Sequence, residues 1–122
     1  MCCKKKKIVR LITSSDYLEH TTPLFYKTGI LKFNDVYKLY IATHMYNLSC
    51  DNLITTHVHS HDTRGHDHAL AAYHRLSQCQ RSISYNGPVI WNDVPSKIKN
   101  SEYIDAFRKC YKAYLLEKYN EC

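Results

Sequence analysis

Apolar side chains recur at helical spacing in two stretches of the chain. The first covers residues 34 to 48, with Asn34 or Asp35 as its N-terminal cap, and the second covers residues 101 to 119, with Ser101 as its cap. The apolar face of the first stretch is wide enough to need partners on two sides, and the second stretch is long enough to be one of them. We therefore predict two principal helices. Their apolar stripes are Val36, Tyr37, Leu39, Tyr40, Ile41, His44, Met45 and Leu48, and Ile104, Phe107, Tyr111, Tyr114 and Leu115.

Residues 82 to 94 have a different pattern. Polar and apolar residues alternate from Ser82 to Tyr85, which is typical of a short strand. The Asn-Gly-Pro sequence that follows is a strong turn signal. Residues 89 to 91 then form either a second strand or one helical turn opened by Pro88. The expected fold is mainly α, of the α+β class, with a short strand and turn segment at 82 to 94.

Residues 10 to 33 are expected to contain a short helical piece from Asp16 to His20, a break at Pro23 and an apolar docking surface. Residues 49 to 79 hold six of the eight histidines and have little periodicity. Thirty residues exceed the usual loop length in a compact domain, so we predict a long, mobile, His-rich loop.

A chain of 122 residues can form one small domain, which we place at residues 10 to 122. No apolar run approaches the roughly twenty residues that span a bilayer, and the N-terminal lysines precede no secretory signal. An intracellular location, in the cytoplasm or nucleus, is the expectation.

The net charge of +6 is concentrated at the start of the chain. Residues 1 to 10 carry five basic side chains and no acid, whereas the other 112 residues carry 12 basic and 11 acidic groups, a balance of +1. We predict a disordered basic tail at residues 1 to 9, which either attracts phosphates or is only solvated. The candidate phosphate contacts along the chain are Lys4, Lys5, Lys6, Lys7, Arg10, Arg64, Arg81, Arg108, Lys109 and Lys112.

Histidines suggest one metal site. His57, His59 and His61 alternate as residues on one face of a strand would, and imidazole is a common zinc ligand. No Cys-x-x-Cys pair accompanies them, so solvated loop histidines are the alternative to a structural zinc site. The six cysteines are irregularly spaced, which favours reduced thiols, with Cys110 as a small hydrophobic residue of the last helix.

Catalytic motifs are missing from the sequence. No adjacent pair of acidic residues, Gly-rich phosphate loop or hydrolase motif occurs, and we expect no activity from the isolated chain. A different class of function is a membrane-associated protein, anchored by acylated Cys2 and Cys3 beside the polybasic run.

Several sequence blocks follow one another in an order that is itself informative. They are Arg10-Leu-Ile-Thr13, His20-Thr-Thr-Pro-Leu-Phe25, Gly29-Ile-Leu-Lys-Phe-Asn-Asp-Val-Tyr-Lys-Leu39, Met45-Tyr46, His59-Ser60, Thr63-Arg64 and residues 80 to 116. Over roughly nine-tenths of the chain, this order resembles the C-terminal region of LINE-type, jockey-like non-LTR retrotransposon reverse transcriptases. His61 and Asp62 stand where that family has Tyr and Asn.

The resemblance implies a non-catalytic part of an RNA-directed DNA polymerase, without a cofactor of its own. Magnesium would belong to the polymerase core, which this chain lacks. The implied partners are that core, template RNA and target DNA, and self-association is a further option. A zinc-binding or protein-interaction module without a nucleic-acid role is the alternative.

Aromatic and apolar residues of the C-terminal part are candidates for the core. Tyr85 and Trp91 could instead stack on bases, although the apolar neighbours of Trp91 favour a core position. The expected core residues are Trp91, Tyr85, Pro88, Phe107 and Leu115.

Overall fold

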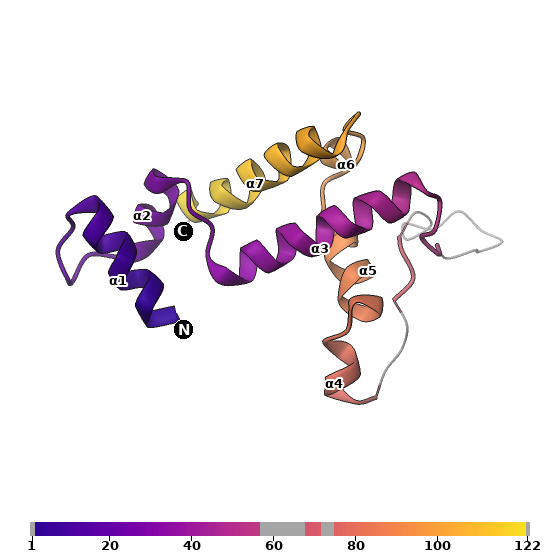
Figure 1. The fold of residues 1–122 in the computed structure, drawn as a ribbon, viewed down its shortest axis with the longest axis horizontal. Coiled ribbons are helices and arrows are strands. Elements are labelled where there is room, and N and C mark those ends of the chain that lie inside the picture. The colour runs from indigo at the N-terminus through magenta and orange to yellow at the C-terminus, as the bar shows by residue number, and fades with distance from the viewer. Residues whose placement is uncertain (1, 57–67, 72–74, 122) are drawn as a thin grey trace.

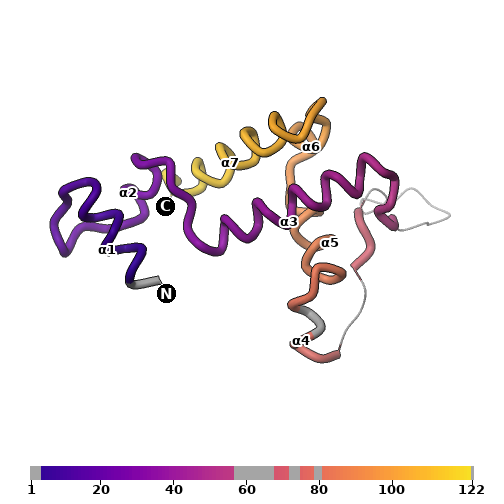
Figure 2. Tube along the Cα trace, viewed as in Figure 1, coloured from indigo at the N-terminus to yellow at the C-terminus, as the bar shows by residue number. Residues whose placement is uncertain are grey.

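The computed structural model describes residues 2–56, 68–71 and 75–121, and within them the protein is mainly α-helical without a β-strand. Figure 1 shows α3 and α7 lying side by side and α5 crossing α3, and Figure 2 shows α1 and α2 near the C-terminal end of α7. The elements in order are α1 (Cys2–Thr13), α2 (Thr21–Thr28), α3 (Phe33–Cys50), α4 (Ser77–Gln80), α5 (Ile83–Asp93), α6 (Ser96–Lys99) and α7 (Ile104–Asn120).

The two predicted principal helices are present as α3 and α7, which run antiparallel (Figure 1). Their buried faces repeat every three or four residues, as the apolar spacing of the sequence requires. The expected caps are wrong, because the N-cap positions belong to Lys32 and Tyr103. Ser101 instead donates its hydroxyl to the carbonyl of Ile98, at 2.7 Å. The buried residues of the two helices are Ile41, Ala42, Met45 and Tyr46, and Phe107, Tyr111, Leu115 and Tyr119.

Aromatic rings form the centre of the core. Phe107 is fully buried, and its ring stacks on Tyr46 with the centroids 4.7 Å apart. Trp91 reaches the same ring from α5, at 6.0 Å. Of the expected core residues, Trp91, Pro88, Phe107 and Leu115 are buried and Tyr85 is half-buried.

The strand predicted from Ser82 to Tyr85 and the turn after it are wrong, since Ile83–Asp93 form the helix α5. Of the two alternatives for residues 89 to 91, the structure has the helical one, as part of this longer helix. Pro88 lies in the interior of this helix, where it cannot donate a backbone hydrogen bond. Local sequence therefore disfavours the helix, and packing overrides it: Gly87, Pro88 and Trp91 are all buried. At Gly87 an added Cβ would lie 2.7 Å from the sulfur of Met45, so the missing side chain permits close contact between α5 and α3.

The N-terminal part also differs from the prediction. Residues 2 to 9 of the expected disordered tail lie in α1, which is attached by the buried Val9 and packs on α2. Asp16 to His20 form turns rather than a helix. Pro23 lies in the first turn of α2, where the backbone N–H groups lack partners within the helix, so it starts the helix instead of breaking it.

Part of the segment 49 to 79 is tied to the rest of the protein. Thr56 and Ala69 form an antiparallel bridge, and Asn92 of α5 binds both backbone groups of Ala69, at 2.8 and 3.0 Å. The short helix α4 follows. The prediction of a mobile loop concerns mainly residues 57–67 and 72–74, which lie outside the described residues.

Candidate nucleic-acid interface

A shallow groove follows the side of α3 that faces the basic residues of α7. It consists of two hollows of about 350 and 530 Å³, a size typical of ligand sites, which share Val36, Leu39 and Arg108. We call it the α3–α7 groove. Its lining is completed by Tyr40, Thr43, His44 and Asn47 in one hollow and by Lys5, Gly29, Ile30, Leu31, Lys109 and Lys112 in the other.

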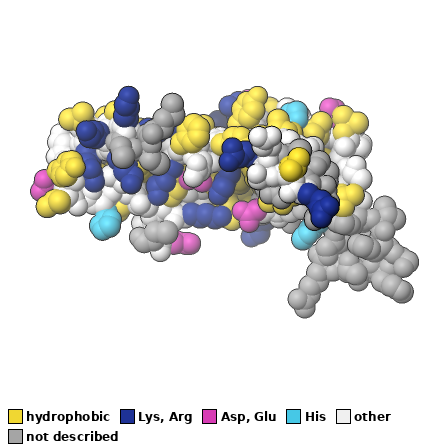
Figure 3. Space-filling model, turned by 90° about the horizontal axis from the view of Figure 1, so that it is seen from below, with side chains coloured by type: hydrophobic (Ala, Val, Ile, Leu, Met, Phe, Trp, Pro, Cys, Tyr) yellow, Lys and Arg dark blue, Asp and Glu magenta, His cyan; other side chains and the backbone are white. Residues whose placement is uncertain are grey.

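The charge of the α3–α7 groove is entirely positive within the described residues. Arg108, Lys109 and Lys112 line it from α7, and Lys5 lines it from α1, while none of the described lining residues is acidic. Three of these cations follow from the helical spacing of α7, because Lys112 lies four residues after Arg108 and three after Lys109, which places them on one side of the helix. Lys5 is brought to them by the fold. Figure 3 shows basic side chains spread among apolar ones on a face of the molecule.

A second cluster of lysines lies where α1 meets the start of α3. Lys5 and Lys6 line a hollow together with Lys32 and Lys38, and the ammonium of Lys5 lies 5.3 Å from the ring centroid of Phe33. Asp35 is the one acidic residue among those that line this hollow in the described structure. Lys5 therefore connects two basic hollows.

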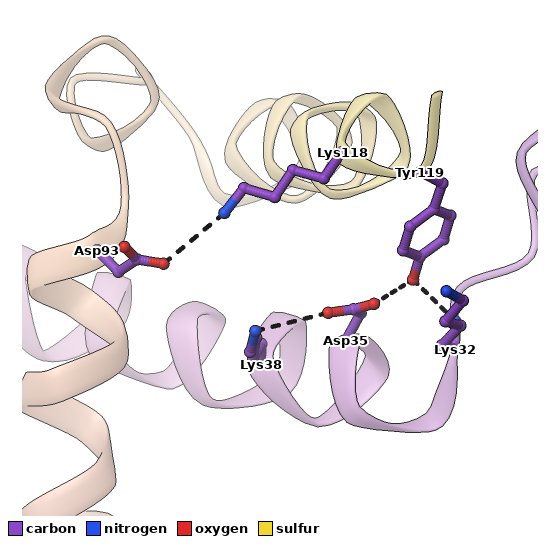
Figure 4. A network of polar contacts seen from close by, with 6 residues as sticks. All are labelled: Lys32, Asp35, Lys38, Asp93, Lys118 and Tyr119. Atoms are coloured by element: carbon purple, nitrogen blue, oxygen red, sulfur yellow. Dashed lines mark hydrogen bonds and ion pairs between the residues drawn. The ribbon is translucent and has the colours of Figure 1, made fainter. Parts of the chain in front are cut away.

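Asp35 has specific partners of its own (Figure 4). The amine of Lys38 lies 3.7 Å from one carboxylate oxygen, and the hydroxyl of Tyr119 donates a hydrogen bond to the other. The same hydroxyl accepts a hydrogen bond from the backbone N–H of Lys32, at 3.0 Å. Burial, together with the hydrogen bond to Asp35, raises the pKa of Tyr119 well above its usual range. This network fixes the end of α7 to the start of α3.

The other predicted phosphate contacts lie apart from the groove or outside the described residues. Lys4 and Lys7 are exposed on α1, but Arg10 donates to the backbone carbonyl of Glu19 at 3.0 Å and lies over the ring of Tyr17. Arg81 is exposed between α4 and α5, and Arg64 lies outside the described residues.

The predicted zinc ligands His57, His59 and His61 also lie outside the described residues. In the described part of the chain, no group of three His, Cys, Asp or Glu side chains is arranged to hold a metal ion. Cys110 is exposed, so its expected role as a small hydrophobic residue is wrong.

The apolar stripe predicted for α3 includes several rings that the structure leaves exposed. Tyr37, Tyr40 and His44 belong to the predicted apolar stripe, yet the structure leaves them exposed, and Phe33 just before them is exposed as well. The side-chain chemistry of Tyr and His was a signal for their exposure. Tyrosine and histidine have polar ends that favour the edge of an apolar face next to water.

No helix among the described residues is long and apolar enough to cross a bilayer. Comparison with protein-family models, with curated proteins and with solved structures finds no match to this chain.

Proposed function

We propose that this protein is a non-catalytic C-terminal region of a LINE-type, jockey-like reverse transcriptase, and that it contacts template RNA or target DNA through the α3–α7 groove. The observation that carries the proposal is the position of Lys5 beside Arg108, Lys109 and Lys112, in a groove whose described lining has no acid. The order of sequence blocks from Arg10 to Leu116 supports the retrotransposon origin.

Clustered cations favour phosphates for a physical reason. A protein that neutralises phosphates releases condensed counterions, so its affinity falls steeply with salt. Isolated surface lysines are usually only solvated, but cations from two separate helices lining one groove can contact successive phosphates of a single strand or duplex. The proposed contact is independent of base sequence.

The same proposal includes packing on the polymerase core. Leu11 and Ile12 of α1 and Leu18 in the following turn are exposed apolar side chains that lie close together in the sequence. Exposed apolar residues that lie together often mark an interaction site. Magnesium and catalysis belong to the polymerase core in this proposal, and the chain alone gives no RNA-templated nucleotide incorporation.

A salt titration of RNA and DNA binding tests the groove. Substituting Arg108, Lys109 and Lys112 by Gln keeps good helix formers in α7 and removes three charges. We expect weaker binding and a decrease of about 2 to 3 in the slope of log K against log salt concentration, because each lost phosphate contact removes about 0.7 to 0.9. Filter binding measures both quantities.

The matched control removes the same charge elsewhere. Lys27, Arg75 and Lys97 are exposed, lie outside the groove lining and are not among the candidate phosphate contacts, and their triple substitution by Gln should leave the slope nearly unchanged. Equal losses from both triple variants would contradict the proposal, since binding would then depend on total charge. Substitution is preferable to removal of residues 1 to 9, because Val9 is buried.

A further inference from the structure

One side of α3 presents a row of exposed rings. Phe33, Tyr37, Tyr40 and His44 follow one another at spacings of four, three and four residues, which places them along a single face of the helix. The opposite face carries the buried residues Ala42 and Tyr46, among others. The row is therefore not part of the core.

The row borders the α3–α7 groove. Tyr40 and His44 line it together with Arg108, whereas Phe33 lines the neighbouring hollow, where the ammonium of Lys5 lies over its ring. Tyr37 is held from the other side, where the side-chain amide of Asn86 donates to its hydroxyl at 3.4 Å. Since α5 and α7 both pack on α3, the rings stand on a helix that is fixed on two sides.

Exposed rings next to phosphate-binding cations match the chemistry of unpaired nucleotides. Base faces stack on aromatic side chains in single strands, whereas in a duplex they are covered by neighbouring base pairs. A purely electrostatic site for duplex DNA needs no such row. We propose that the α3–α7 groove binds single-stranded nucleic acid, with bases stacked on Tyr37 and Tyr40 and phosphates on Arg108, Lys109 and Lys112.

The spacing of the rings favours separated bases. Residues three and four apart on a helix differ by about 4.5 and 6 Å along its axis. Bases stacked on each other are about 3.4 Å apart, so one uninterrupted base stack cannot match successive rings. A strand whose bases are unstacked from one another, with each base lying on the face of its own ring, fits this row.

This inference rests on the proposed function, and its test separates the two. The test variant replaces Tyr37 and Tyr40 by Ala, and a second variant replaces both by Phe, which retains the ring. A third changes Tyr40 alone to Ala, because this leaves the bond between Tyr37 and Asn86 intact. The control replaces Tyr17 and Tyr26 by Ala; these are 73% and 42% exposed, close to the 71% and 40% of Tyr40 and Tyr37.

Fluorescence anisotropy is measured with single-stranded RNA and DNA of about 15 nucleotides, with duplexes of the same length, and with poly-glutamate as a competitor. Circular dichroism checks that each variant is folded. We expect the double Ala variant to lose about tenfold or more in affinity for single strands, with little change for duplexes and an unchanged salt slope. The Tyr40 variant should lose less, and the Phe and control variants should bind like the original protein.

Four results would overturn the inference. Equal affinity for single strands and duplexes would remove stacking and leave the proposed electrostatic contact in place. Unchanged single-strand binding by the Tyr37 and Tyr40 double Ala variant and by the Tyr40 Ala variant would do the same. Poly-glutamate competing as well as single-stranded RNA would reduce the groove to a general polyanion site. Absence of any RNA or DNA binding at low salt would overturn the proposed function as well.

Discussion

Tyr119 joins two helices through a single hydroxyl group. It is buried on α7, accepts a hydrogen bond from the backbone N–H of Lys32 and donates one to Asp35 at the start of α3. The ammonium of Lys32 also lies 4.6 Å from the centroid of its ring. A hydroxyl that satisfies two partially buried groups contributes more than its own hydrogen bonds, because its removal leaves both without that partner.

We expect Tyr119→Phe to lower the free energy of unfolding by about 1 to 3 kcal/mol. The raised pKa of Tyr119 also makes stability depend on pH. An unfolded tyrosine ionises near pH 10, while the folded one stays protonated, so this contribution is fully present below about pH 10 and is lost as the pH rises further. Urea unfolding between pH 8 and 11 should therefore show a smaller alkaline loss in the Phe variant.

Tyr111→Phe is the control for this change. It removes a hydroxyl from the same helix but retains the ring that stacks on Phe107, with centroids 5.9 Å apart. The pKa of Tyr111 is also raised by burial, so this variant should likewise flatten the alkaline loss while costing less stability at pH 7. A loss at pH 7 as large as that of the Tyr119 variant would show that the interhelical hydrogen bonds contribute little.

At the scale of elements, the contact of α5 with α3 depends on a glycine, Gly87, whose lack of a side chain allows the close approach to Met45. We expect Gly87→Ala to lower the free energy of unfolding by about 1 kcal/mol, because crowding against Met45 outweighs the gain in helix propensity. In a Met45→Ala background the same change should stabilise the protein by about 0.5 to 1 kcal/mol. Denaturant unfolding of the four proteins of this double-mutant cycle measures the coupling.

Gly29 provides a matched glycine. Its φ of +65° ends α2 in the left-handed region, and an added Cβ would meet nothing within 4 Å. Gly29→Ala should lower stability only because an L residue is strained in this left-handed backbone conformation. Its effect should therefore be the same whether Met45 is retained or replaced by Ala. Coupling of Gly29 with Met45 as strong as that of Gly87 would mean that the cycle reports a general loss of structure.

Sequence patterns predict some of these elements and not others. The three- and four-residue spacing from Val36 to Leu48 and from Ile104 to Leu115 is a local property, and it gave both α3 and α7. The helix α5 was missed because Gly87 and Pro88 signal a turn locally, whereas their burial against α3 is a tertiary effect. The helix α1 was missed because a run of lysines resembles a solvated tail.

The candidate site also has features that the sequence predicts and features that only the tertiary structure shows. Its cations were identified from charge alone, but the approach of Lys5 to Arg108 depends on how α1 packs on α2 and α2 on α7, which no local pattern contains. The rings of Tyr37 and Tyr40 were assigned to the core because helical spacing does not tell which edge of a wide apolar face is covered. That depends on where α5 and α7 pack.

At the scale of the whole molecule, exposed apolar residues are concentrated around α1. Leu11 and Leu18 are the most exposed large apolar side chains among the described residues. We expect the purified protein to self-associate as its concentration rises, and the double change of Leu11 and Leu18 to Gln to shift it toward the monomer. Sedimentation velocity across a range of concentrations measures this shift.

Leu53 and Leu76 are also exposed but lie away from α1, and their double change to Gln is the control. It should leave self-association unchanged. An equal effect of both pairs would indicate general surface stickiness rather than an interface at α1.

The pairing of α3 with α7 has a consequence for synthesis of the protein. Tyr46 donates to the carbonyl of Ser101 at 2.6 Å at one end of the pair, and Tyr119 binds Lys32 and Asp35 at the other. A nascent chain that has emerged only as far as α5 therefore exposes the face of α3 that Phe107 and Tyr111 later cover. Such a chain is a natural client for ribosome-associated chaperones until α7 has been translated.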